Sequence, residues 1–264
     1  MIRRAAVAAV AALLAGCAAA GGAAGPATAP GGYLSPAALE ALTVAPAADP
    51  DLDGLAGLPP VAPGSDRWWM ATAHAELRPP WAPQHFDCVL HTRLADRPRP
   101  ALARVMGRLT ADVIALARQR PSTGGVAGVR PFEATLGLEP CERLPATGRT
   151  NGASPATGAV LAGAYGEMFA ALVPEAAGEV RRTAREIGWS RAVCRMNWPA
   201  EVEAGLDTGA RLFAAAAAQP DFAPELERAR VEVAAARAEG LSSAACAAER
   251  RALRQWSAPA AASS

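Results

Sequence analysis

The sequence predicts an all-α protein folded as a compact helical bundle. Several segments carry apolar residues at helical spacing, no stretch shows the sustained alternation of a β-strand, and β-branched residues are sparse. Alanine accounts for 69 of the 264 residues. Alanine-rich faces let helices approach closely, which suits a compact bundle.

The N-terminus is predicted to be a lipoprotein signal peptide, residues 1–16. Arg3 and Arg4 precede an apolar run, Ala5–Leu14, that is too short to remain as a membrane span. The run ends in Leu-Ala-Gly directly before Cys17, which resembles a bacterial lipobox. That resemblance implies that Cys17 is lipidated and becomes the first mature residue. Ordinary signal cleavage among residues 18–20 is the alternative.

The same resemblance predicts the location. Ala18 follows the cysteine where an aspartate would favour retention in the inner membrane, so we expect a periplasmic protein anchored to the outer membrane by its lipid alone. A soluble periplasmic protein is the alternative. Residues 17–32 are rich in Gly, Ala and Pro and are predicted to be a flexible tether.

The body of the chain follows as an arm, a helical domain and a tail. Residues 33–64 are broken by prolines and are expected to lie as an extended arm on the domain, which spans residues 65–257. Ser65 or Asp66 caps a first helix that Pro79-Pro80 ends. Further helices are expected at Leu94–Arg120, Ser154–Leu172, Ala176–Ile187, Pro199–Ala218, Pro224–Ala238 and Ser243–Trp256.

Local signals refine these helices. Pro199 suits a first helical turn and Gly188 a helix end. Residues 121–153 are the longest predicted loop, and residues 258–264 a frayed tail. The tryptophans are expected to pack in the core or at helix junctions: Trp68, Trp69, Trp81, Trp189, Trp198 and Trp256.

The composition excludes several kinds of chemistry. All 26 basic residues are arginine, which removes lysine Schiff bases and lysine phosphate clamps. The formal net charge of +1 argues against nucleic-acid binding. The histidines are His74, His85 and His91 only, and no metal or cofactor motif is present. Export would place the remaining cysteines in an oxidising compartment, where three pairings are open to Cys88, Cys141, Cys194 and Cys246.

Three segments carry a family resemblance: VRPF at 129–132, NGASPATGAVLAGAYGEMFAALVPE at 151–175 and GWSRAVCRMNWPAEVEAG at 188–205. Together with their flanks they resemble the bacterial class A nonspecific acid phosphatases. These enzymes belong to the type 2 phosphatidic acid phosphatase superfamily, which includes the vanadium haloperoxidases. The resemblance covers nearly the whole mature chain in the family's order, and it implies a helical bundle of that kind.

The family hydrolyses phosphomonoesters through a phosphohistidine. Its chemistry needs a histidine nucleophile, an acid that orients it, a second histidine that protonates the leaving group, and a cationic cradle. The first motif, lysine, six residues and Arg-Pro, is matched at Arg130 and Pro131, but Thr123 replaces the lysine. The second, Pro-Ser-Gly-His, keeps only its proline, and Gly158 stands at the acid histidine.

The third motif is Ser-Arg, five residues, His, three residues, Asp. Ser190 and Arg191 match it, but Asn197 stands at the nucleophile and Glu201 at the orienting acid. Asparagine forms no phosphohistidine and glycine donates no proton. No catalytic position is therefore intact. A lone upstream histidine or Cys194 could in principle substitute, but a structural role is the more usual one for each.

A phosphate site is what the resemblance still predicts. Arg130 and Arg191 would direct guanidinium groups at a phosphate or phosphomonoester, and Thr157 with the start of its helix would add backbone N–H groups. The alternative is that both arginines are buried partners of Glu201 or Glu133. The sequence thus predicts an inactive pseudophosphatase that binds an anion or serves as a scaffold. An active acid phosphatase with an altered mechanism is the second hypothesis, and neither specifies the oligomeric state.

Overall fold

Helices form all the regular structure in the residues that the computed structural model describes, which are 31–43, 52–58, 61–119, 129–134, 139–142 and 156–259. The prediction of an all-α protein is therefore confirmed. In order, the elements are α1 (Pro36–Glu40), α2 (Leu52–Ala56), α3 (Asp66–Ala73), η1 (Ala82–Phe86), α4 (Asp87–Leu90), η2 (Leu94–Asp96), α5 (Pro100–Gln119), α6 (Pro131–Ala134), α8 (Thr157–Leu172), η4 (Pro174–Ala176), α9 (Ala177–Val193), α10 (Pro199–Ala217), α11 (Phe222–Ala238) and α12 (Cys246–Gln255).

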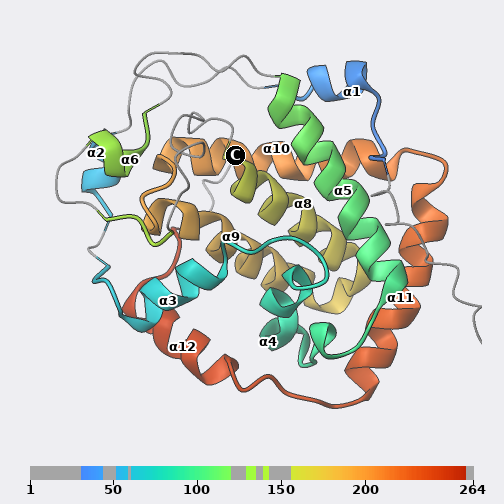
Figure 1. The fold of residues 1–264 in the computed structure, drawn as a ribbon. Coiled ribbons are helices and arrows are strands. Elements are labelled where there is room, and N and C mark those ends of the chain that lie inside the picture. The colour runs from blue at the N-terminus through green and yellow to red at the C-terminus, as the bar shows by residue number, and fades with distance from the viewer. Residues whose placement is uncertain are drawn as a thin grey trace, which may run out of the picture.

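Helix α8 lies at the centre of the bundle (Figure 1). It packs against α9 and α10, and α5 and α11 cover another side, while α3 packs on α9 and α12 packs on α3. Most of α8 is buried and apolar, as expected for a helix surrounded by others. Tyr165 of this helix is buried. Its hydroxyl donates to Leu77 O at 3.1 Å and is hydrogen-bonded to the Thr110 hydroxyl at 2.6 Å.

Glycines bring α8 and α10 into backbone contact. A Cβ on Gly209 of α10 would overlap Val160 O and lie 2.7 Å from Ala164 N. A Cβ on Gly163 of α8 would overlap Leu206 O in the same way. Close helix approach is predicted from alanine, whereas glycines set the distance between these two helices.

Consecutive helices α8, α9 and α10 run antiparallel because only short connections, residues 173–176 and 194–198, join them. Helices α8 and α9 have nearly equal lengths, 16 and 17 residues. The start of α8, the end of α9 and the start of α10 therefore meet at one end of the bundle. Gly158, Arg191 and Asn197, three of the positions singled out by the resemblance, come together there.

The arm is anchored at its beginning. Asp112, buried on α5, accepts the Tyr33 and Leu34 N–H groups at 2.9 and 3.0 Å. Arg108 lies over the Tyr33 ring, 3.7 Å from its centroid, and Tyr33 donates its hydroxyl to Glu225 of α11 at 2.7 Å. The prediction of a wholly extended arm is wrong in one respect, because residues 33–64 include α1 and α2.

Three helix boundaries differ by five residues or more from those predicted. Helix α3 ends at Ala73 instead of at the Pro79-Pro80 pair, because tertiary partners take the following carbonyls: His85 Nε2 donates to Glu76 O at 2.8 Å. The expected helix Leu94–Arg120 begins at Pro100, after a 3₁₀ turn, and the Glu232 carboxylate caps it through the N–H groups of residues 101 and 102. Helix α9 continues past Gly188 to Val193.

Gly188 is not a helix end but a packing position. A Cβ there would lie 2.8 Å from a methyl carbon of Leu206, so the glycine makes room for α10. The tail is also ordered further than predicted: Ala258 N donates to Glu186 Oε1 at 2.7 Å, and Pro259 O accepts from Arg185. Residues 260–264 lie outside the described residues, as do the predicted signal peptide and the tether up to residue 30.

Burial separates the tryptophans into two groups. Trp68, Trp189, Trp198 and Trp256 are buried as predicted. Trp69 and Trp81 are 61% and 57% exposed, so the expectation of core packing is wrong for these two. Within the described ranges, no helix combines the length and apolar character needed to cross a membrane.

Replacing Gly209 by alanine should destabilise the protein by about 3 kcal/mol, because the added methyl group has no space between the two backbones. Urea unfolding would measure this loss. Gly178→Ala is the control: the nearest atom to its Cβ is Arg182 Nη1 at 3.8 Å, so we expect no loss and a gain of up to about 1 kcal/mol. Equal effects of the two substitutions would contradict the close-packing argument.

Candidate functional site

The motif residues converge at the end of the bundle where α8 begins. Gly158, in the first turn of α8, packs directly on the Arg191 side chain of α9, since a Cβ on Gly158 would lie 2.7 Å from Arg191 Cδ. Thr157 is the first residue of α8 and is exposed. The first N–H groups of a helix have no partner within it and carry partial positive charge. Arg191 therefore lies over an electropositive helix end.

Arg130 belongs to the same end of the molecule. Its Nη1–H donates to Met196 O at 2.8 Å, in the loop between α9 and α10. The short segment that carries Arg130 is joined to this loop twice more: Trp198 Nε1 donates to Val129 O at 2.9 Å, and Phe132 N to Arg195 O at 3.3 Å. The two arginines predicted to bind phosphate are thus brought together from segments about 60 residues apart.

The charge of Arg191 acts on the guanidinium of Arg130. Burial lowers the pKa of Arg130, the Arg191 charge lowers it further, and the carboxylates of Glu133, Glu201 and Glu142 oppose both effects. Two like charges in a half-buried site favour an anion between them. The arrangement is therefore suited to an oxyanion.

Asn197 and Glu201 lie next to this pair, at the positions where the family resemblance expects a nucleophile and its orienting acid. The Glu201 carboxylate accepts Trp198 N–H at 3.0 Å and Asn197 Nδ2–H at 3.4 Å. It thus caps the start of α10, and Pro199 takes the first helical position as predicted. Burial raises the pKa of Glu201, although these hydrogen bonds and the Arg130 charge oppose the rise.

The alternative that Glu201 or Glu133 pairs with both arginines does not hold for Arg191. Glu133 Oε2 accepts the backbone N–H of Arg130, at 3.2 Å, and Glu201 caps α10. Arg191 instead forms an ion pair through Nη1 with Glu142, and neither side chain is more than 22% exposed. Sequence analysis missed Glu142; its one signal was its place directly after a cysteine.

A disulfide holds Glu142 at this place. Cys141 is bonded to Cys194, with Cα atoms 4.7 Å apart, and Cys88 to Cys246, with Cα atoms 5.4 Å apart. The structure thereby selects one of the three possible pairings. Cys194 is a disulfide partner, and as such it has no free thiol with which to act as a nucleophile. Cys194 follows Arg191 by three residues, about one helical turn, so its partner Cys141 brings Glu142 beside that arginine.

Ser190, the neighbour of Arg191 in the motif, serves a different cluster. Its hydroxyl donates to Glu186 O at 2.8 Å and accepts from Arg67 Nη1 at 3.1 Å. His74 Nδ1 lies 2.8 Å from the same oxygen. Because the Ser190 hydroxyl has a single proton, which it donates to Glu186 O, His74 Nδ1 carries the proton of the third contact and donates it to Ser190.

Two of the three histidines are held in or beside the Ser190 cluster. Burial, with the nearby His85 and Arg67, lowers the pKa of His74, which keeps it neutral and fixed on Ser190. His85 packs edge-on against it with ring centroids 5.1 Å apart, and donates to a backbone carbonyl. His91 is exposed and has a left-handed conformation at the end of α4.

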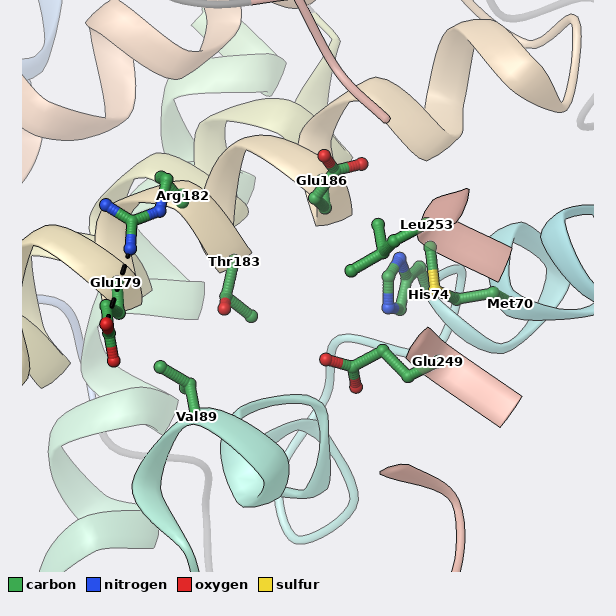
Figure 2. A pocket seen from close by; sticks show the side chains of 9 residues that line it. All are labelled: Met70, His74, Val89, Glu179, Arg182, Thr183, Glu186, Glu249 and Leu253. Carbon is green, nitrogen blue, oxygen red and sulfur yellow. Dashed lines mark ion pairs between the residues drawn. The ribbon is translucent and has the colours of Figure 1, made fainter. Parts of the chain in front are cut away.

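A separate cavity of about 250 Å³ adjoins this cluster (Figure 2). The Glu249 carboxylate points toward its middle, and the Glu179–Arg182 ion pair borders one side. Glu186 also lines it, and lies about 140° around α9 from Arg191. The cavity is thus distinct from the arginine pair. In the described parts of the chain, no group of three or more acidic, His or Cys side chains is placed to hold a metal ion.

Of the remaining predicted positions, Thr123 and Cys17 lie outside the described residues. No protein-family model matches the chain, and no curated protein matches its sequence.

Ser190→Ala should lower the free energy of unfolding by about 1–3 kcal/mol, because it removes an acceptor from the buried groups of Arg67 and His74. Urea unfolding would measure it. Thr72→Ala is the matched control, since that hydroxyl donates to a carbonyl one turn back, Trp68 O at 3.0 Å. A Ser190 loss no larger than the Thr72 loss would contradict the role of Ser190 as the centre of this cluster.

Proposed function

We propose that this protein is an exported, acid phosphatase-like lipoprotein without phosphatase chemistry, which retains a phosphate-binding site at Arg130 and Arg191. The observation that carries the proposal is the contact between Gly158 and Arg191. The place where the family resemblance expects a proton-donating histidine is filled by the stem of an arginine, 2.7 Å from a Cβ on Gly158. A histidine does not fit there unless Arg191 moves.

The rest of the site agrees with binding without turnover. Both arginines and the start of α8 offer donors to an oxyanion, while Asn197 lies against Glu201 and supplies no nucleophile. Arg191 Nε is buried and has no hydrogen-bond partner among the described residues, which leaves a donor for a further oxygen. We infer that the ligand is a phosphate or a phosphomonoester and that the fold is of the type 2 phosphatidic acid phosphatase kind.

The proposed location is the periplasm, with a lipid anchor in the outer membrane. The two disulfides support export, because such bonds form and persist in oxidising compartments. The anchor rests on the lipobox-like sequence before Cys17. Incorporation of labelled palmitate into Cys17 but not into a Cys17→Ala variant would test it.

Phosphate binding should stabilise the protein. At a phosphate or vanadate concentration ten times Kd, we expect a gain of about 1.4 kcal/mol and a rise in Tm of about 3–6 °C. Arg130→Ala should abolish the rise because it removes one of the two guanidinium groups. Arg181→Ala, which breaks an exposed ion pair with Glu167, should keep it. No rise in the wild type would exclude phosphate binding and leave a scaffold.

The protein should not hydrolyse p-nitrophenyl phosphate at any pH from 4 to 8, since acid–base catalysis alone contributes roughly 10²–10⁴-fold and the nucleophile is also missing. The release of nitrophenolate measures this. The control is the Arg191→Ala variant, which should release nitrophenolate at the same background rate as the wild type. Robust turnover that Arg191→Ala abolishes would instead establish the second hypothesis, an active phosphatase with an altered mechanism.

A further inference from the structure

Glu142 already occupies part of the proposed anion site. Its carboxylate accepts from Arg191 Nη1, and the two side chains are 22% and 13% exposed. We propose that Glu142 is an internal carboxylate ligand that competes with phosphate for Arg191, so that phosphate binds by displacing it. The inference rests on the proposed function and adds regulation to the same site.

The Cys141–Cys194 disulfide makes this competition strong. Glu142 directly follows Cys141, and Cys194 lies about one turn after Arg191. The cross-link therefore keeps the carboxylate within reach of the guanidinium. A tethered group competes with a free ligand at an effective concentration in the millimolar range or above, without any additional contact.

Phosphate nevertheless satisfies the site better than the carboxylate does. Glu142 bonds Arg191 at Nη1, which leaves the buried Nε–H without a hydrogen-bond partner in the described part of the chain. A phosphate dianion brings more charge and more oxygens, enough to reach Nε, Arg130 and the first N–H groups of α8 together. Glu142 thus weakens phosphate binding without abolishing it.

The size of the effect follows from occupancy. If the carboxylate occupies Arg191 in about nine molecules out of ten, the apparent Kd for phosphate rises about tenfold over that of the open site. Removing the negative charge while keeping the size of the side chain should recover this factor.

The decisive experiment is calorimetric titration of the full-length mature protein with inorganic phosphate. Glu142→Gln should bind phosphate about tenfold more tightly than the wild type. Glu167→Gln is the matched control, because Glu167 is similarly exposed at 25% and pairs with Arg181. It lies nine residues beyond Gly158, about 13 Å along α8. The phosphate affinity of Glu167→Gln should equal that of the wild type.

A second pair of variants tests the tether. Cys141→Ala/Cys194→Ala should also bind phosphate more tightly, since the carboxylate loses its fixed position. Cys88→Ala/Cys246→Ala removes the other disulfide and should not change the affinity. Circular dichroism would establish that each variant is folded, and Glu142→Gln decides the question if a double variant is not.

The outcomes separate the two proposals. Equal phosphate affinity of wild type and Glu142→Gln, lost in Arg191→Ala, would overturn the competition but leave the anion site standing. Weaker binding by Glu142→Gln would also overturn it, because Glu142 would then assist the ligand. Absence of binding in all variants, Glu142→Gln included, would overturn the phosphate site itself and the inference with it.

Discussion

The contact between the backbones of α8 and α10 is the constraint on which the rest of the structure depends. Gly163 and Gly209 face each other's helix so closely that neither position accepts a side chain. Helix α8 is consequently enclosed by its neighbours, and its apolar residues become the centre of the core. Because α9 lies between these helices in the sequence and packs on both, its register follows from theirs.

That register places the candidate site. Antiparallel packing of α8 and α9 brings Gly158 against Arg191, and the next connection brings Asn197 and Glu201 to the same end. Helix geometry alone therefore assembles the motif positions, whatever side chains they carry. In such a bundle, packing fixes where the positions of a site lie, whereas individual side chains supply the chemistry of the site.

Two adjacent residues of α9 have different roles, one in packing the core and one at the candidate site. Ser190 turns toward Arg67 and His74 and serves the packing of α3, whereas Arg191 turns toward the start of α8. Successive side chains on a helix differ by about 100°, so a two-residue motif can support the core with one member and meet a ligand with the other. The buried cluster around Ser190 accounts for two of the three histidines in the chain.

The sequence by itself determined the fold class and the general position of the long helices, because apolar spacing and alanine content are local properties. It also singled out Arg130, Gly158, Arg191 and Asn197 as positions that would meet. It did not determine where α3 and α9 end, since carbonyls after Ala73 are bound by distant groups and Gly188 serves contact with Leu206. Only the tertiary structure decided the disulfide pairing and the partner of Arg191: Glu142 is 49 residues away in the chain, and no local pattern encodes a contact made through a distant cross-link.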